Sequence, residues 1–171
     1  TTMETLAKMK PAFKKEGGTV TAGNASGVND GAAFMVLAAA DVAAKAGQKP
    51  IARLVSYAVA GVPNHIMGEG PIPATKIALQ RAGLTLDKID VIESNEAFAA
   101  QALAVTKGLG LDPAKTNVNG GAVALGHPVG CTGAAIATKA IYELHRTGGK
   151  HALVTMCIGG GQGIAAIFER I

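Results

Sequence analysis

Charged residues are scarce in this chain of 171 residues, where Asp, Glu, Lys and Arg make up 16%, against about 25% in an average soluble domain. Hydrophobic residues make up 49%. A chain with so little charged surface is expected to bury part of its outer face against another chain or another part of the same protein. Because the sequence starts at Thr1 rather than Met, we expect it to be a piece of a longer product.

Aromatic residues are also few, at 4% with no Trp, and the Lys and Arg behind the net charge of +4 are dispersed. Nucleic-acid binders combine a basic face with stacking aromatics, so that class of partner is not indicated. The longest fully apolar stretch, near residues 31–40, is too short to cross a bilayer. We therefore predict that neither nucleic acid nor a membrane is a partner.

Two cysteines do not make a disulfide framework, and no signal peptide is visible. These absences favour a cytoplasmic protein. His65, His145 and His151 show no metal-binding spacing with either cysteine. We expect no metal site.

Apolar runs alternate with helix-like segments along most of the chain. Strands are expected at residues 32–39, 50–61, 89–94, 116–121, 150–157 and 163–171, and helices at 1–13, 41–47, 73–82, 95–110 and 133–149. The order βαβαβαββ predicts an α/β fold in which a mixed, mostly parallel sheet is covered by helices on both faces. The last two strands can form an antiparallel hairpin.

Three polar clusters fall at the ends of expected strands, where loops meet helix N-termini and functional groups collect. They are SNEAF (94–98), GHPVGCTG (126–133) and CIGGG (157–161). Asn95 is either a helix N-cap or an amide that donates a hydrogen bond into a site. His127, between Gly126 and Pro128, is either a base on a stiff loop or a solvent-facing histidine.

Cys157 ends an expected strand and is followed by three glycines. Glycines can adopt positive φ and leave their N–H groups unblocked, so a thiol here can lie beside an oxyanion hole. A thiolate near neutral pH needs a positive environment, which His127 and helix N-termini are expected to provide. The alternative is a buried cysteine before a tight turn. Cys131, near a helix start, is a rival thiol or a small packing residue.

Taken together and in this order, NEAFAAQ, GGAVALGHPVG and CIGGGQG resemble the C-terminal half of thiolases, the acetyl-CoA acetyltransferases and 3-ketoacyl-CoA thiolases. GTVTAGNASGVNDGAA (18–33) and GPIPATKIAL (70–79) match as well, so the resemblance covers essentially the whole chain. It implies one half of a five-layered αβαβα fold. Residues 1–30 would be the end of a loop region and linker, and residues 31–171 the thiolase C-terminal domain.

The resemblance also implies the reaction, a reversible Claisen condensation of two acyl-CoA molecules to a 3-ketoacyl-CoA and CoA, with no cofactor besides the CoA thioesters. The leading function is acetyl-CoA C-acetyltransferase. The alternatives are a medium- or long-chain 3-ketoacyl-CoA thiolase of β-oxidation, and a non-catalytic CoA-binding subunit. A ketoacyl-synthase-type condensing enzyme lacks a C-x-G-G-G cysteine, so Cys157 argues against it.

Site roles follow from the same resemblance. His127 would activate the nucleophilic cysteine and help hold the thioester oxygen, and Cys157 would move the α-carbon proton. Asn95 would position a water in one oxyanion hole, and the N–H of Gly159 would donate in a second. Three positions would line the CoA and pantetheine channel: Ser26, Ala97 and Phe98.

The acyl-accepting cysteine of thiolases belongs to their N-terminal half, and neither Cys131 nor Cys157 matches its motif. The resemblance therefore implies an N-terminal half that carries this cysteine as a partner. It also implies assembly as a homodimer or homotetramer.

Overall fold

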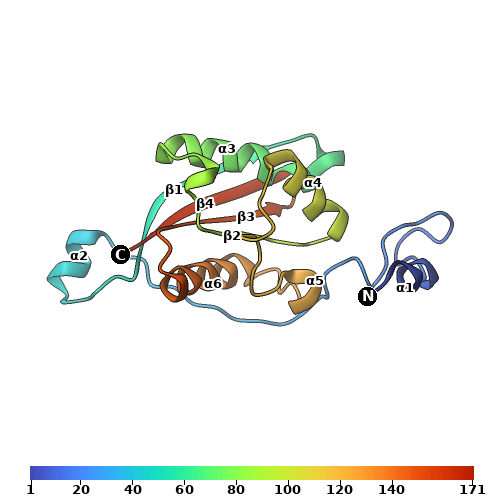
Figure 1. Cartoon of the computed structure of the whole chain (residues 1–171), viewed down its shortest axis with the longest axis horizontal. Helices are drawn as coiled ribbons and strands as arrows, with labels where there is room; N and C mark the ends of the chain where they lie inside the picture. The colour runs from blue at the N-terminus through green and yellow to red at the C-terminus, as the bar shows by residue number, and fades with distance from the viewer.

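The computed structural model describes residues 1–171, and its body is a four-stranded sheet between two layers of helices (Figure 1). The strands are β1 (Ala52–Gly61), β2 (Val91–Ser94), β3 (His151–Ile158) and β4 (Gln162–Arg170). The α-helices are α1 (Met3–Lys8), α2 (Ala40–Lys45), α3 (Pro71–Ala82), α4 (Ala99–Leu109), α5 (Ala122–Leu125) and α6 (Thr132–Thr147), and two 3₁₀ helices are η1 (Asn64–Glu69) and η2 (Leu86–Lys88).

The sheet has the order β1-β4-β3-β2. β4 pairs antiparallel with both β1 and β3, and β2 pairs parallel with β3. The expectation of a mixed sheet is confirmed, and so is the hairpin formed by the last two strands. The expectation of a mostly parallel sheet is wrong, because β4 lies inside the sheet and makes two of its three pairings antiparallel.

Two expected strands do not form in this chain. Residues 32–39 run extended beneath α6 without a strand partner, and Phe34 and Val36 are 91% and 99% exposed (Figure 1). Residues 116–121 contribute only one parallel bridge, between Thr116 and Ile92. An apolar run becomes a strand only where a neighbouring strand offers its backbone groups, and neither segment has a full-length neighbour here.

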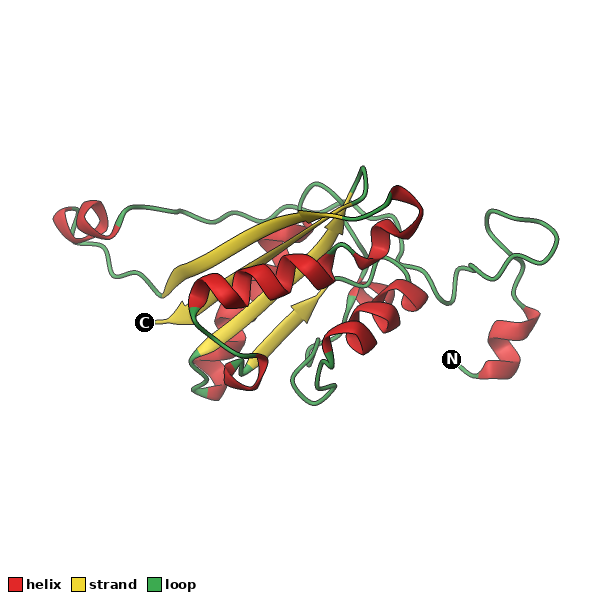
Figure 2. Cartoon of the chain, turned by 90° about the horizontal axis from the view of Figure 1, so that it is seen from above, coloured by secondary structure: helices red, strands yellow, loops and turns green.

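Helices cover both faces of the sheet, as predicted. Figure 2 shows the sheet between its helical layers from above. On one face, α3 covers a core that includes Ile92, Leu153 and Ile167; on the other, α6 covers a core that includes Val91 and Val154. Adjacent residues of a strand point to opposite faces of the sheet. A residue's position along its strand therefore decides whether its side chain lies on the α3 face or on the α6 face.

The helix ends are partly as expected. Left-handed glycines at Gly83 and Gly148 end α3 and α6. However, α4 begins at Ala99 rather than at Asn95, because residues 95–98 are not helical and Phe98 is extended and bridges to Ala25.

The short helices α1 and α2 project from opposite ends of the body (Figures 1 and 2). Ala39 is the N-cap of α2, which begins one residue before the expected start at residue 41. None of the helices combines the length and the hydropathy that crossing a bilayer requires.

Candidate functional site

Asn95 directly follows β2 at the end of the sheet. Its backbone N–H donates to the carbonyl of Thr155 at 2.9 Å, which extends the parallel pairing with β3 by one residue. The side chain is 3% exposed. Since α4 starts four residues later, Asn95 is not a helix cap, and its amide is free to serve another purpose.

That amide meets the imidazole of His127, because Asn95 Nδ2 lies 3.4 Å from His127 Nε2. The other ring nitrogen, Nδ1, lies 2.7 Å from the hydroxyl of Thr132, and this hydroxyl donates to the carbonyl of Pro128 at 3.0 Å. A hydroxyl has one proton to give. Thr132 therefore accepts from an Nδ1–H, which leaves the lone pair on Nε2 as the acceptor for the Asn95 amide.

Burial supports the same protonation state, because it lowers the pKa of the His127 imidazole. A neutral imidazole with its lone pair on Nε2 can take up a proton on the side that faces Asn95. The arrangement thus suits a general base that is oriented by the hydroxyl of Thr132.

A segment far away in sequence holds these loops together. Gly27 accepts from the backbone N–H of His127 at 3.0 Å. The hydroxyl and the backbone N–H of Ser26 both donate to the carbonyl of Ala97, at 2.9 and 3.1 Å. Ser26, Ala97 and Phe98, all predicted for one channel, therefore lie together, and Phe98 is 39% exposed.

Glu96 also binds backbone outside its own loop. Its carboxylate accepts from the backbone N–H of Val123 at 3.1 Å and from the amide of Asn117 at 3.2 Å. Asn117, the one non-glycine residue with positive φ, makes two further bonds to the backbone of Ser94 at 2.9 and 2.8 Å. Glu96 thus joins the loop after β2 to the first turn of α5, and it lies outside α4.

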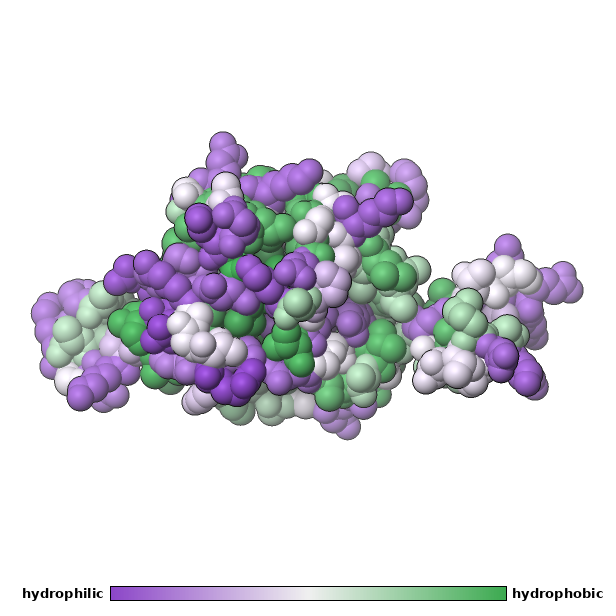
Figure 3. Space-filling model, in the orientation of Figure 1, coloured by the Kyte–Doolittle hydropathy of each residue, from purple (hydrophilic) through white to green (hydrophobic).

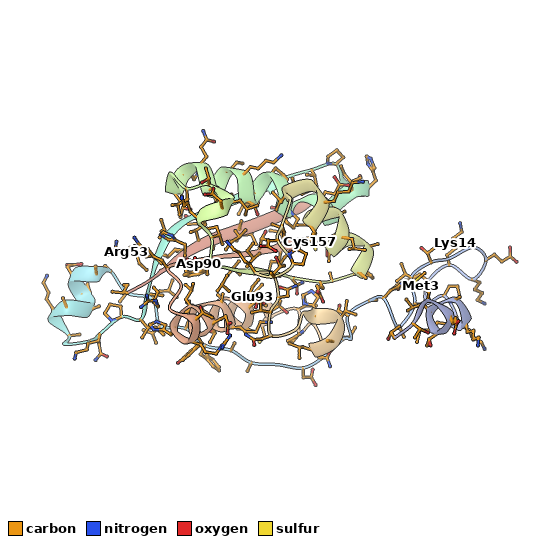
Figure 4. The ribbon with its side chains drawn as sticks, in the orientation of Figure 1. Met3, Lys14, Arg53, Asp90, Glu93 and Cys157 are labelled. Carbon is orange, nitrogen blue, oxygen red and sulfur yellow. The ribbon has the colours of Figure 1, made fainter.

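Cys157 lies near the end of β3, half-buried and opposite Gly163 of β4 (Figure 4). Leu153 belongs to the α3 core and Thr155 contacts Thr75 of α3, so alternation puts Cys157 on the α3 face. Glu93 and Asn95 lie on the α6 face. The thiol and the Asn95 amide therefore reach the same end of the sheet from opposite faces, and convergence of the sulfur with the imidazole stays a prediction.

The turn after Cys157 is open. Gly159 is exposed, and a Cβ built on it would meet nothing within 4 Å. Gly160 and Gly161 both have φ of +77°, in the left-handed region that favours glycine. The expected positive φ is thus present at the second and third glycines, while Gly159 is exposed and has open space where a side chain would lie.

The electrostatics of the thiol differ from what the sequence led us to expect. Burial raises the pKa of the Cys157 thiol above its usual value, and only its own backbone hydrogen bond opposes this. A neutral His127 supplies no positive charge to lower it. Within this chain Cys157 is therefore a protonated thiol, able to give a proton before it can take one.

Comparison with known families shows where this arrangement belongs. Residues 48–170 match the thiolase C-terminal domain and residues 1–41 match the thiolase N-terminal domain. The chain belongs to the thiolase family. The division predicted between residues 30 and 31 stays a prediction. The two matched ranges are separated by residues 42–47.

Individual thiolases agree closely with this one in sequence and structure. The beta-ketothiolase BktB of Cupriavidus necator is 65% identical over 170 residues. The crystal structure of the Bacillus anthracis acetyl-CoA acetyltransferase has a TM-score of 0.93 at 52% identity, and that of human mitochondrial 3-ketoacyl-CoA thiolase in complex with CoA has 0.89 at 50%. The chain is covered to 99–100% in each case but spans only 43% of each relative's length.

Two residues of this thiolase chain that matter for the site were not singled out from the sequence. Thr132, the first residue of α6, comes five positions after His127 and orients its ring. Glu93 comes two positions before Asn95 and shares its face of β2. Two features of the sequence could have identified them. Thr132 places a hydroxyl five positions after the candidate base His127, and Glu93 lies two positions before the candidate amide of Asn95, on the same face of an expected strand.

Proposed function

We propose that this chain provides the acid–base half of the active site of an acetyl-CoA C-acetyltransferase. The observation that carries the proposal is the chain of contacts from Asn95 through His127 to Thr132, which gives a neutral imidazole with a defined lone pair. Family membership supports the same chemistry, because the relatives named above are thiolases and acetyltransferases.

In the proposed condensation, His127 takes the thiol proton of a cysteine of a thiolase N-terminal domain. The resulting thiolate attacks the thioester of the first acyl-CoA, so that the acyl group passes to this cysteine and CoA leaves with the proton. Cys157 then acts as a thiolate, a form that the partner domain would have to favour, and takes a proton from the α-carbon of a second acyl-CoA. The resulting carbanion attacks the acyl carbonyl, so that a carbon–carbon bond forms and the bond to the partner cysteine breaks. Cys157 gives the proton it took to the departing cysteine thiolate, so the products are a 3-ketoacyl-CoA and a free enzyme thiol.

Oxygen atoms become negatively charged during both steps, and donors must lie where that charge develops. Asn95 would hold a water beside His127 Nε2 for one oxygen, and the exposed N–H of Gly159 would donate to the other. Ser26, Ala97 and Phe98 would line the channel for the pantetheine arm. The human relative crystallised with CoA supports a CoA thioester as the substrate.

The exposed apolar surface supports a partner domain. Hydrophobic side chains reach the surface between the helices of the visible face (Figure 3). Phe34, Leu125 and Val129 are 91%, 62% and 71% exposed near the site loops, and large exposed apolar patches mark interaction surfaces. We infer that they pack on a thiolase N-terminal domain, so that the three layers here form one half of a five-layered αβαβα fold within a homodimer or homotetramer.

A chimera tests the proposal directly. Residues 1–171 would replace the 170 matched residues of Cupriavidus necator BktB, which then supplies the N-terminal domain. We expect the chimera to condense acetyl-CoA and to cleave acetoacetyl-CoA with CoA, while the separate 171-residue chain does neither. A folded chimera that binds CoA without turnover would instead indicate a non-catalytic subunit.

The substrate range of the chimera decides between two thiolase functions. A 3-ketoacyl-CoA thiolase is the second candidate, favoured by the TM-score of 0.89 to the human mitochondrial enzyme of that name. Cleavage of long 3-ketoacyl-CoA chains at a kcat/KM above that for acetoacetyl-CoA would favour it. A steep preference for acetoacetyl-CoA would favour the acetyltransferase.

A further inference from the structure

A cavity of about 190 Å³ lies behind the Asn95 amide, between the end of β2 and the first turns of α6. Glu93 and Asn95 line it from the strand side, and Thr132 and Lys139 line it from the helix. The cavity therefore adjoins both residues that contact the imidazole of His127. Figure 4 labels Glu93 in this region between the sheet and α6.

Two oxygens with unmet hydrogen-bonding capacity belong to this cavity. Four buried side-chain polar atoms in the chain have no partner, and two of them are Glu93 Oε1 and Asn95 Oδ1. The two residues are 1% and 3% exposed. Buried acceptors are nearly always satisfied in folded proteins, so two of them lining one cavity indicate a donor that serves both.

No donor of the protein lies within hydrogen-bonding distance of either oxygen. Lys139 Nζ lies 2.8 Å from Glu93 Oε2 and donates to the carbonyl of Gly120 at 2.6 Å. Asn95 Nδ2 faces His127. Burial raises the pKa of the Glu93 carboxyl, but the ammonium of Lys139 at Oε2 opposes this and favours the carboxylate. In that form Oε1 only accepts, as Asn95 Oδ1 does, so the bridging group must offer two hydrogens in a small polar space, which describes water.

We propose that this cavity holds ordered water that donates to both Glu93 Oε1 and Asn95 Oδ1, and that Glu93 is thereby a positioning residue for the Asn95 amide. The inference rests on the proposed function, since it concerns the group that faces His127. A water occupies about 30 Å³ of liquid volume, so the cavity has room for several. Because Glu93 and Asn95 are two apart on one strand, they share a face and one water chain spans them.

The orientation of the amide is what the water secures. If the Asn95 amide turned over, its oxygen would face the lone pair on His127 Nε2, and its NH₂ group would face the water instead. Water held by the buried carboxylate points its hydrogens toward Asn95 and opposes that turn. Lys139 holds the carboxylate in place through the other oxygen.

The test uses Glu93→Gln in the chimera described above, with Glu143→Gln as the matched control. Glu143 is another buried carboxylate on the α6 side, bonded to Arg146 and Asn119 at 2.6 and 2.9 Å, and it does not line the cavity. The amide introduced by Glu93→Gln would present an NH₂ group to the water and reverse its polarity. We expect kcat to fall about tenfold with KM within about twofold, and Glu143→Gln to leave kcat within about twofold.

A double-mutant cycle with Asn95→Ala separates positioning from general stability. If Glu93 acts through Asn95, Glu93→Gln costs less than about twofold once the amide is gone. An equal loss in both backgrounds, or a loss no larger than that of Glu143→Gln, would overturn the inference while leaving the proposed function intact.

A high-resolution crystal structure of the chimera gives a readout that needs no activity. Water within about 3.2 Å of both oxygens, directly or through one neighbouring water, supports the inference. A cavity without such water overturns it. An inactive chimera would refute the proposed function, and this crystallographic result would still decide the role of Glu93.

Discussion

The two parts of the candidate site are built in opposite ways. In the amide–imidazole part, side-chain contacts of 3.4 and 2.7 Å join Asn95, His127 and Thr132. Backbone hydrogen bonds also connect this part to Gly27 and Thr155, which are distant in sequence. The thiol part, Cys157 and Gly159, sits at an open turn with no surrounding side chain at Gly159.

This difference shows which chemistry the chain sets by itself. Burial lowers the pKa of the imidazole, and Thr132 favours the tautomer with its lone pair on Nε2, so this chain by itself favours a neutral, oriented base. The thiol has a raised pKa and no positive neighbour, so its acidity depends on what covers the turn. Variants of either part can therefore show whether the imidazole is set by this chain alone and whether the thiol depends on a covering domain.

The largest effect is expected for His127→Ala in the chimera. Loss of the base removes both the activation of the partner cysteine and the partner of the Asn95 amide, so acyl-enzyme formation should fall about 10³–10⁴-fold. Mass spectrometry of the acylated enzyme measures this. His151→Ala, at the opposite end of β3, is the control, and unchanged acylation in His127→Ala would remove the imidazole from the chemistry.

Cys157→Ser should act on only one step. A serine hydroxyl is a far weaker acid than a thiol, so condensation of acetyl-CoA should fall about 10²–10³-fold. Acylation of the partner cysteine should continue near the unaltered rate. Because the two rates are measured on one protein, condensation at near wild-type speed would show that the sulfur is a packing group.

What the sequence predicted well was local. Apolar runs, glycine stops and polar clusters at strand ends depend on neighbours a few residues apart, and they located Asn95, His127 and Cys157 at one end of a helix-covered sheet. The α3 and α6 ends at Gly83 and Gly148 followed from the same short-range reasoning.

What the sequence could not give depends on partners far along the chain. The start of α4 is delayed to Ala99 because Ser26 and Ala25, some seventy residues earlier, bind Ala97 and Phe98 outside the helix. The insertion of β4 between β1 and β3 makes the sheet mostly antiparallel, and no local pattern marks it. Residues 32–39 have strand-like composition but no strand beside them in this chain.

Thr132 offers a smaller and more selective test of the amide–imidazole part. Thr132→Val keeps the shape of the side chain but removes the acceptor for the His127 Nδ1–H, so the ring can adopt the wrong tautomer. We expect kcat to fall about tenfold. Thr132→Ser, which keeps the hydroxyl, should stay within about twofold, and equal losses in the two variants would show that packing rather than hydrogen bonding is at work.

The smallest effect concerns the acidity of the thiol. In the 171-residue chain carrying Cys131→Ser, the alkylation rate of Cys157 with iodoacetamide should rise with pH and reach half its maximum above pH 9.0, the usual value for this group. The sign follows from burial, which disfavours the thiolate and so moves the titration upward. Only the thiolate reacts, so the rate reports its fraction.

The same titration in the chimera completes the contrast between the two parts. If the N-terminal domain brings positive charge to the open turn, the midpoint should drop below that of the separate chain, and alkylation at pH 8 should speed up severalfold. A midpoint already below pH 9.0 in the separate chain would mean that this chain activates its own thiol. The thiol part would then be as self-contained as the imidazole part.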